Sequence, residues 1–286
     1  MSNLIGINEV QNNIQKAWAP IFTKQLREKF LLPALVNSSY QGQIANQGDT
    51  VRVSQMAAPT GQLLTVGTNA DSFSPEAIDL TYVDLKCDKR AVASFKFSDL
   101  VSLQSQISPD NPEVMSAMTH AINKQINTHI YSLIAASSSA PDHQLSGVSD
   151  FNASQLAACR VLAGQSYWDM SNAFALLDPQ YHQDLINATT MSSADYSSDQ
   201  PLVAGQMGQK RLGFRVFEDV SMGADHGIVA TPDFMLFAAQ TQVQVKISDL
   251  HALGQFGVQM SVDIVFGAKL SNQGSVKHIQ VYNSAW

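Results

Sequence analysis

The stretch Gly48-Asp49-Thr50-Val51-Arg52-Val53 does most to decide the fold of this chain. Its two valines alternate with polar residues, which is the pattern of a half-buried β-strand. Turn residues precede it in Asn37-Ser38-Ser39-Tyr40-Gln41-Gly42, and glycines and prolines recur as far as Pro75. Because they leave no room for a helix of useful length between Val36 and Phe97, we predict extended chain over this whole region.

Two further strands are expected near the end of that region, over residues 78–87 and 91–97. The second strand alternates alanine and phenylalanine with Val, Ser and Lys, so that one face is suited to burial. Asp88 and Lys89 separate the two strands. We expect these two residues to form the turn of a hairpin.

The middle of the extended region has too few apolar residues to form a core. We interpret residues 55–74 as part of a long two-stranded arm, which is only marginally stable alone in water. A neighbouring surface is therefore expected to bury its apolar side chains, which are Met56, Leu63, Leu64, Val66 and Phe73.

Residues 112–136 carry the strongest helix pattern. Apolar residues recur there every three or four positions, with Asn, Lys and Gln on the opposite face. A helix of this length would measure about 37 Å at a rise of about 1.5 Å per residue. The Ser137-Ser138-Ser139-Ala140-Pro141 tract ends it and marks a candidate domain boundary.

Helices and strands alternate in the remaining chain. Capping residues followed by proline predict helices that open at Pro179 and Pro232, and the second of these is expected to run over residues 232–239. A further helix is predicted over residues 152–163. The remaining apolar and alternating runs predict strands, which are 173–177, 214–217, 227–230, 243–247, 258–266 and 276–282.

The N-terminal segment reads as a helical arm that Pro20 interrupts. Its apolar residues recur at helical spacing over positions 4–32, but the segment is too short to bury them within itself. We expect Trp18, Ile21 and Phe22 to contact another subunit.

Composition excludes several functional classes. The chain has 286 residues, of which 14% are charged, and a net charge of −7, whereas charged residues average about 25% in globular proteins. An acidic chain is a poor candidate for a nucleic-acid reader, because that affinity comes mainly from Lys and Arg. No apolar stretch approaches the ~20 residues of a membrane-spanning helix. The N-terminus lacks the features of a signal peptide, so the cytoplasm is the expected compartment of synthesis.

No constellation of residues predicts catalysis or cofactor binding. Cys87 and Cys159 are expected to be buried free thiols, since neither belongs to a metal-binding motif. The run Gly164-Gln165-Ser166-Tyr167-Trp168 resembles half of a hydrolase nucleophile elbow, but its second glycine is replaced by Trp168. We therefore expect no catalytic residue, no metal and no cofactor.

Two arms that cannot be buried within their own chain indicate a protein that assembles with copies of itself. Scarce charge agrees with this interpretation, because the cores of interfaces are depleted of charged residues. Heterologous contacts of this type close into rings or larger shells.

The order of these elements resembles that of a known family. The segment Trp18-Ala19-Pro20-Ile21, the runs at 37–42 and 48–53, the long helix and the strand Gly213-Phe214-Arg215-Val216 together resemble the major capsid proteins of tailed bacteriophages with the Hong Kong ninety-seven-type fold. The resemblance covers nearly the whole chain. Its most specific part is 48–53 with the run that precedes it.

The resemblance implies an α+β subunit with five regions. These are an N-terminal arm (1–40), an extended β-hairpin loop with peripheral-domain strands (41–97), a long spine helix with peripheral domain (98–144), an axial domain (145–240) and C-terminal strands that return to the peripheral domain (241–286).

The implied function is structural, and the implied location is the virion after synthesis in the host cytoplasm. Pentamers and hexamers of such subunits form an icosahedral head around double-stranded DNA. Some relatives begin with a cleaved scaffolding segment for which this chain has no room, so a separate scaffolding protein is expected. The other implied partners are a portal, a decoration protein and DNA that is contacted weakly and without sequence specificity.

Two alternatives stay open at this stage. An encapsulin is a bacterial nanocompartment shell of similar fold that holds protein cargo instead of DNA. An α/β hydrolase that uses Ser166 belongs to a different class altogether. The long polar hairpin favours the phage capsid over the encapsulin.

Overall fold

A computed structural model of the chain describes residues 30–40, 50–66, 73–98, 112–136, 144–188, 210–240, 244–251 and 254–284. The chain divides into two compact units. The smaller unit contains residues 93–120 and 245–262 in addition to the N-terminal segment, and the larger unit contains residues 28–92, 121–244 and 263–286. The predicted N-terminal arm, with Trp18, Ile21 and Phe22, lies outside the described residues.

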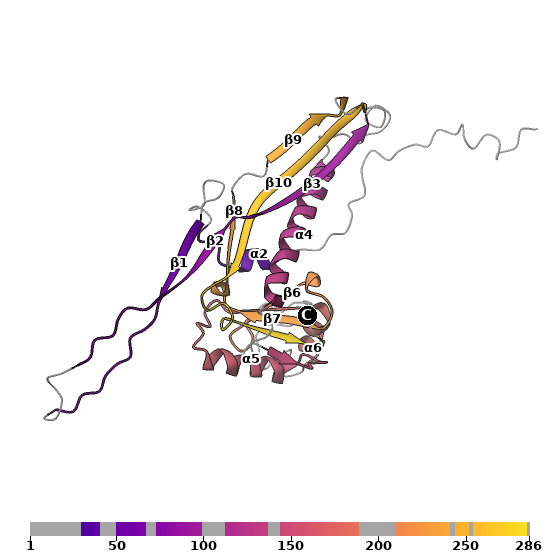
Figure 1. The fold of residues 1–286 in the computed structure, drawn as a ribbon. Helices are drawn as coiled ribbons and strands as arrows, with labels where there is room; N and C mark the ends of the chain where they lie inside the picture. Colours follow the sequence, from indigo (N-terminus) through magenta and orange to yellow (C-terminus); the bar gives the residue numbers. More distant parts are fainter. Residues whose placement is uncertain are drawn as a thin grey trace, which may run out of the picture. The chain divides into compact units, whose positions relative to one another are not determined.

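The larger unit contains a five-stranded mixed sheet, of which β6 and β7 are labelled in Figure 1. Two of its neighbouring pairs are parallel and two are antiparallel. In spatial order the strands are β4 (Gln144–Ser146), β11 (His278–Tyr282), β7 (His226–Ala230), β5 (Phe174–Leu177) and β6 (Arg215–Glu218). The positions of β5, β6 and β7 agree with the sequence prediction to within one residue at each end.

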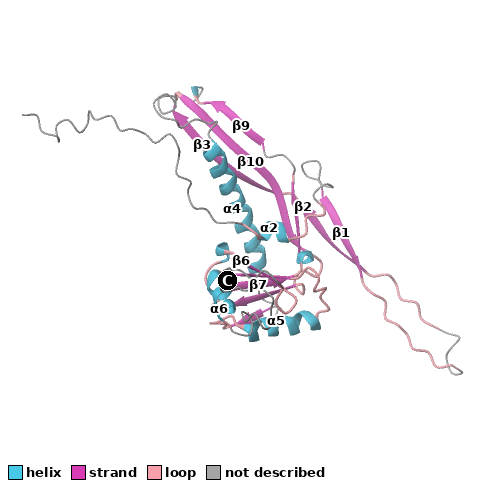
Figure 2. Cartoon of the chain, turned by 180° about the vertical axis from the view of Figure 1, so that it is seen from behind, coloured by secondary structure: helices cyan, strands magenta, loops and turns pink. Residues whose placement is uncertain are grey.

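Two helices with capped N-termini, α5 and α6, lie next to this sheet, as Figure 2 shows from behind. Helix α5 (Ala153–Gln165) begins with a capping box, in which the Asn152 side chain and the Gln155 side chain each satisfy a backbone N–H of the first turn. Helix α6 (Pro179–Asn187) begins after Asp178, whose carboxylate accepts the N–H of Tyr181 at 2.9 Å. Both helices were predicted at nearly these bounds.

The core between sheet and helices is built from apolar side chains of both. Phe151 and Tyr181 stack with ring centroids 5.6 Å apart, and both are fully buried. Leu156 and Cys159 of α5 pack in the same cluster with the alternate residues of β5 and β7 that face them. Each large apolar side chain that is fully buried stabilises the fold by about 1.5–3 kcal/mol, so this cluster contributes strongly to the stability of the larger unit.

Helix α4 (Pro112–Ala136) has the bounds that the sequence predicts. In its second half, within the larger unit, Ile122, Ile126, Ile130 and Ile134 recur every four residues and are at most 5% exposed. The Ile134 carbonyl accepts a 2.6 Å hydrogen bond from the side chain of Gln280 in β11. The hydroxyl of Tyr131 donates to the buried carboxylate of Asp219 at 2.9 Å.

A second sheet contains β3 (Lys89–Ser98), β10 (Gly257–Leu270) and β8 (Met235–Ala239) in that order, and β9 (Gln244–Asp249) also pairs with β10. In the smaller unit, the Phe97 carbonyl lies so close to Gly257 that a side chain there would collide with it. In the larger unit, the same kind of close approach occurs at Gly267 of β10.

The helix predicted over residues 232–239 is wrong. Only Pro232–Phe234 forms a short 3-10 turn (η5), and Met235–Ala239 is strand β8, in which every residue is buried. A short continuous apolar run fits a fully buried strand as well as a buried helix, so periodicity could not separate the two. Pairing with β10 decides the outcome.

The hairpin predicted around Asp88 and Lys89 is also wrong. Strand β2 (Leu80–Lys86) pairs with β1 (Thr50–Met56), and β3 pairs with β10, so these two residues carry the chain from one sheet to the other. The short helix α2 (Leu32–Leu35) precedes Asn37, which bridges to Leu236 of β8. Pro33 therefore lies in the first turn of a helix instead of following its end.

The three C-terminal strands belong to two different sheets. Strands β9 and β10 belong to the sheet of β3, whereas β11 lies between β4 and β7 in the five-stranded sheet. A parallel partner in β4 and an antiparallel partner in β7 hold β11 there.

Candidate interaction surface

The predicted two-stranded arm is an antiparallel pair of strands, β1 and β2. Their register runs from Thr50 opposite Lys86 to Met56 opposite Leu80. Burial alternates along β1, with one face half-buried and the other exposed. This alternation follows from the two-residue period of a strand and gives the hairpin an inner and an outer face.

The inner face of the hairpin base is anchored on β8 and β10. Its valines, Val51, Val53 and Val83, pack against a buried cluster that includes Leu85, Cys87, Leu236 and Ala238. The side-chain amide of Asn272 donates to the carbonyls of Val53 and Thr81, at 3.3 Å each. These contacts hold both strands at the base.

An ion pair crosses the outer face at the same level. Arg52 donates from Nε and Nη2 to the two oxygens of Asp84 at 2.8 and 3.0 Å. The guanidinium also lies over the ring of Tyr82, 4.1 Å from its centroid. The hydrogen bond from Arg52 lowers the pKa of Asp84, and its charge adds to that effect.

Beyond the base, isolated hydrogen bonds continue the pairing. The N–H of Ala57 donates to the carbonyl of Asp79 at 3.0 Å, and the N–H of Thr60 donates to the carboxylate of Glu76 at 2.8 Å. The side chain of Gln62 bonds both the N–H and the carbonyl of Ser74. The hairpin is therefore ordered by its own polar groups far from any core.

The apolar side chains of this distal part are exposed. The exposed fraction is 61% for Met56, 98% for Leu63, 90% for Val66 and 76% for Phe73, whereas Leu64 is half-buried. A monomeric protein seldom leaves such a series of large apolar side chains in water, and larger exposed patches mark interaction sites.

Three further apolar residues of this surface were not predicted from the sequence. Ile78, Leu80 and Tyr82 are 74%, 57% and 58% exposed, and their spacing of two residues places them on one face of the strand. Met56 lies opposite Leu80 in the register and extends the row onto β1. The alternation was visible in the sequence, but it did not reveal which face was buried.

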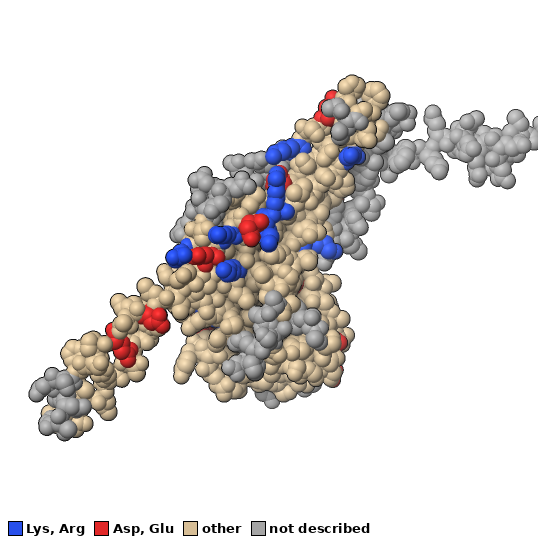
Figure 3. All heavy atoms as spheres, viewed as in Figure 1, with Lys and Arg blue, Asp and Glu red and all other residues tan. Residues whose placement is uncertain are grey.

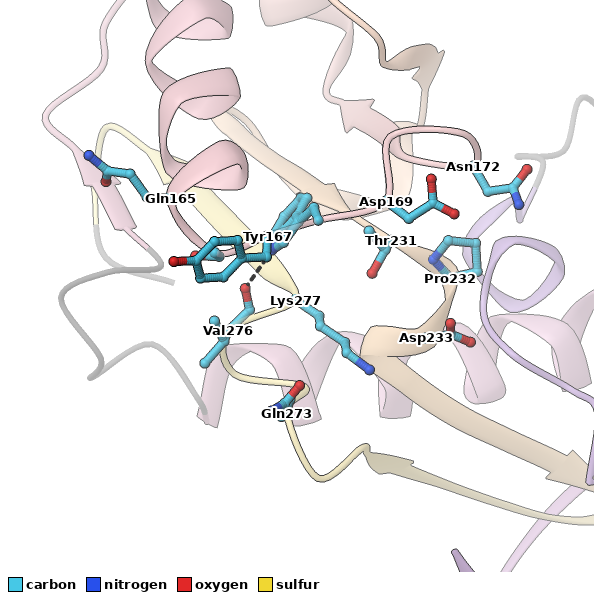
Figure 4. Close-up of a pocket in the computed structure, with 12 residues that line it drawn as sticks. Gln165, Tyr167, Asp169, Asn172, Thr231, Pro232, Asp233, Gln273, Val276 and Lys277 are labelled. Atoms are coloured by element: carbon cyan, nitrogen blue, oxygen red, sulfur yellow. Dashed lines mark hydrogen bonds between the residues drawn. The ribbon is translucent and has the colours of Figure 1, made fainter. Parts of the chain in front are cut away.

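Ser166 is one of the residues that line a separate pocket of about 660 Å³. Figure 4 shows this pocket with Tyr167 and Lys277 among its labelled lining residues. Ser166 caps the C-terminus of α5, and Tyr167 after it has a positive φ of 57° and a side chain that is 94% exposed. No histidine is among the residues that line this pocket, and the segment follows a helix instead of a strand. The geometry thus gives Ser166 neither the base nor the turn that a hydrolase nucleophile needs.

The described residues contain no group of three or more His, Cys, Asp and Glu side chains placed to hold a metal ion. Cys87 and Cys159 are free and buried, as predicted. Burial raises the pKa of Cys159 to about 12, so this thiol is not in its reactive form at neutral pH. Among the described helices, none combines the length and the apolar character that crossing a membrane requires.

Comparison of the sequence finds no matching family model and no matching curated protein. Comparison of the fold finds solved structures that match over nearly the full length of both chains. A structure from Mycobacterium phage Che8 has a TM-score of 0.76 at 20% identity and covers 96% of this chain and 98% of its own. The capsid of cyanophage P-SCSP1u has a TM-score of 0.76 at 13% identity, with 99% and 96% covered.

The chain has the fold of phage capsid proteins. The capsid asymmetric unit of cyanophage Pam1 gives the same result, with a TM-score of 0.72 at 13% identity and 99% of each chain covered. This confirms the tailed-phage capsid fold and the α+β class that the resemblance implied. The structures with this capsid fold named here come from phages, and they give the encapsulin alternative no support.

Proposed function

We propose that this chain is the major capsid protein of a tailed bacteriophage. Copies of it assemble into the pentamers and hexamers of an icosahedral head that encloses double-stranded DNA. Its role is structural and involves no catalysis. The observation that carries the proposal is the match to solved phage structures, capsids among them, over 96–99% of the chain.

The hairpin supports this proposal independently. In its distal part Leu63, Val66 and Phe73 are each at least 76% exposed, although side chains of this size each gain about 1.5–3 kcal/mol when they are buried. In the proposed head, neighbouring copies cover this surface. Met56, Leu63, Leu64, Val66 and Phe73 are the proposed contact residues, to which Ile78, Leu80 and Tyr82 are added. Trp18, Ile21 and Phe22 are proposed contacts of the N-terminal arm.

The division into arm, loop, spine helix, peripheral domain and axial domain belongs to the same proposal. So do the further partners, which are a separate scaffolding protein, a portal, a decoration protein and weakly contacted DNA. The proposed location is the virion, after synthesis in the host cytoplasm. The net charge of −7 supports weak DNA contact, since a chain of that charge offers few cations for phosphates.

The test is to express the chain alone and together with its neighbouring genes, and to image the purified product by electron microscopy. Closed icosahedral shells, or pentamers and hexamers that close when the scaffolding protein is added, are the expected products. A protein that stays monomeric at all concentrations and in the presence of all these partners would refute the proposal. Shells filled with enzyme instead of DNA would support an encapsulin.

A further inference from the structure

Helix α5 ends with a tyrosine at a position that usually holds glycine. After the C-cap Ser166, the N–H of Tyr167 donates to the carbonyl of Gly164 at 3.2 Å. The N–H of Trp168 donates to the carbonyl of Ala163 at 3.0 Å. This is the Schellman arrangement, in which the residue after the C-cap has a left-handed backbone and is most often glycine. Here that residue is Tyr167, with a φ of 57°.

The side chain of Tyr167 contributes little to the fold. It is 94% exposed, and within the described part of the chain it has neither a hydrogen-bond partner nor a stacked ring. A left-handed backbone has a steric cost for every residue with a Cβ atom, and residues held in such conformations cluster at binding and active sites. The exposed ring therefore indicates a role outside the stability of the subunit.

Tyr167 lines the 660 Å³ pocket, which lies within the larger unit. Three segments form its walls, namely the end of α5 with the loop that follows, the chain after β7, and the loop before β11. Figure 4 shows the Tyr167 ring at one end and the carboxylates of Asp169 and Asp233 at the other, with Lys277 in between. Pockets of about 300–1,000 Å³ are typical of small-molecule sites.

Hydrogen bonds join the walls of this pocket. The indole N–H of Trp168 donates to the carbonyl of Val276 at 2.9 Å, which is the dashed line in Figure 4. The N–H of Thr231 donates to the carbonyl of Lys277 at 3.1 Å. A ligand would thus meet a preformed site, and binding would not have to order the loops first.

Several polar side chains of the lining keep free hydrogen-bonding capacity. Within the described residues, the side chains of Gln165, Gln273 and Lys277 have no hydrogen-bond partner. The carboxylate of Asp233 accepts a bond from Asn37 through one oxygen at 2.7 Å, which leaves acceptor capacity on the other oxygen. Ammonium and amide donors therefore lie among amide and carboxylate acceptors. Such a mixture suits hydroxyl groups, which donate and accept at the same time.

The charges of the lining restrict the class of ligand. Two carboxylates, those of Asp169 and Asp233, oppose the single ammonium of Lys277, so an anionic ligand is disfavoured. On the face that Figure 3 shows, Lys and Arg gather where β2, β3 and β10 lie, and none is seen where β7 and α5 lie. An apolar ligand would leave the polar groups of the pocket desolvated and unpaired. A neutral ligand with many hydroxyl groups avoids both costs.

We propose that this pocket binds a short neutral oligosaccharide, with a sugar ring stacked on Tyr167 and hydroxyl groups bonded to Gln273, Lys277 and Asp233. The C–H bonds on the face of a sugar ring are weakly positive, and the face of an aromatic ring is negative, so the two attract each other. The site goes beyond the proposed function and does not depend on it. In an assembly of many copies, weak binding at each pocket would add up to firm attachment to a glycan surface.

Sugar binding to the full chain tests this proposal. The probes are maltotriose, cellotriose, mannotriose and N-acetylchitotriose, with inorganic phosphate as an ionic comparison, and binding is measured by isothermal titration calorimetry and saturation-transfer NMR. Tyr167→Gly removes the ring at a position that suits glycine, whereas Tyr167→Phe keeps the ring as a matched control. Gln273→Ala removes an exposed amide from another wall of the pocket. Thermal midpoints show whether each variant is folded.

We expect the unchanged chain to bind at least one of the four sugars. Tyr167→Gly should weaken that binding at least about tenfold, because the stacking surface is lost. Its thermal midpoint should stay equal or rise, since glycine relieves the left-handed backbone. Gln273→Ala should also weaken binding, and Tyr167→Phe should bind like the unchanged chain. Loss of binding without loss of stability is a result that a folding defect cannot produce.

Three outcomes would overturn the proposal. They are no binding of any of the four sugars, unchanged binding by Tyr167→Gly, and binding of inorganic phosphate in place of the sugars. If Tyr167→Gly binds sugar normally but no longer assembles, the ring belongs to a contact between copies instead. Each of these outcomes leaves the proposed function intact, because shell formation by the unchanged chain tests that function separately.

Discussion

The backbone carbonyl of Lys86 lies against Gly267, in the space that a Cβ atom would occupy. This contact brings the end of β2 onto β10, next to the point where Gly267 pairs with Ala238 of β8. Only glycine, which has no Cβ atom, lets the Lys86 carbonyl approach the β10 backbone so closely. Gly267 therefore allows the base of the hairpin to pack against the sheet.

Gly267→Ala should therefore destabilise the subunit. The added methyl group meets backbone atoms of Lys86 and Cys87, which cannot rotate away as a flexible side chain could. We expect a loss of about 1–3 kcal/mol in the free energy of unfolding, as for other overpacked sites. Thermal and urea denaturation measure this loss. The matched control is Gly61→Ala in the distal hairpin, where no atom lies within 4 Å and stability should stay unchanged.

Removal of the distal hairpin should separate folding from assembly. Replacing residues 58–78 by Asn-Gly leaves Ala57 and Asp79, which already pair, joined by a two-residue turn that suits antiparallel strands. The described residues among those removed, 58–66 and 73–78, contribute almost nothing to the core, so the thermal midpoint should change little. Shell formation should fail, as electron microscopy would show. Normal shells from this variant would contradict the role assigned to the hairpin.

The effect of Arg52 on the pKa of Asp84 should be measurable when the carboxyl groups of the protein are titrated. Hydrogen bonding to Arg52 lowers the pKa of Asp84, so the folded state favours the ionised carboxylate. The resulting stabilisation is present above the pKa of about 3.9 that an unfolded aspartate has, and it is lost as pH falls through the lower pKa of the folded state. Arg52→Met should raise the pKa of Asp84 towards that ordinary value in a carbon-13 NMR titration.

Asp169 provides the control for this titration. Its pKa is also lowered, mainly by a hydrogen bond from the backbone N–H of Ser171, and it has no contact with Arg52. Arg52→Met should leave the titration of Asp169 unchanged. Equal shifts of both carboxyls would indicate a general change of fold and would contradict the specific pairing.

Tyr131→Phe should destabilise the larger unit by about 1–3 kcal/mol, the usual cost of leaving a buried polar group without its partner. The Tyr131 hydroxyl donates to one oxygen of Asp219, whose other oxygen is bonded to Ser221, and Asp219 is 1% exposed. Denaturation in urea measures the change.

Tyr282→Phe is the matched control for that substitution. It removes a hydroxyl that bonds the neutral side chain of Gln144 at 2.9 Å in a half-buried place. Its cost should be clearly smaller, because water can replace this bond. Equal losses in the two variants would show that the charge and burial of Asp219 are unimportant.

The sequence predicted helix α4 to the residue because the pattern of Ile122, Ile126 and Ile130 is purely local. A capping residue followed by proline located α6 for the same reason, whereas the same signal at Thr231-Pro232 opens only a 3-10 turn. Strand β8 was not predicted because the run Met235–Ala239 is apolar on both faces. Such a run shows no alternation of apolar and polar residues that would distinguish a strand from a helix. Its conformation depends on residues 266–270 of β10, which lie at least 27 positions further along the chain.

Some residues of the candidate interaction surface could also be predicted from the sequence, and others could not. Met56, Leu63, Val66 and Phe73 could be proposed from the sequence, because the segment around them contains too little apolar surface for a core. Ile78, Leu80 and Tyr82 could not, since an alternating strand shows that one face is buried without showing which. Lys269 of β10 donates to the carbonyl of Asp84 in β2, a contact that only the folded chain brings about.

By itself, the sequence determined the elements whose causes are local. These are a helix of 25 residues, an extended arm with too few apolar residues to form a core, and turns at glycine and proline. Tertiary structure alone decided the strand partners, since hydrogen bonds between strands depend on which segments meet in space. It paired β2 with β1 instead of β3, and it placed β11 between β4 and β7. The inner face of the hairpin was fixed in the same step, when the Lys86 carbonyl packed against Gly267.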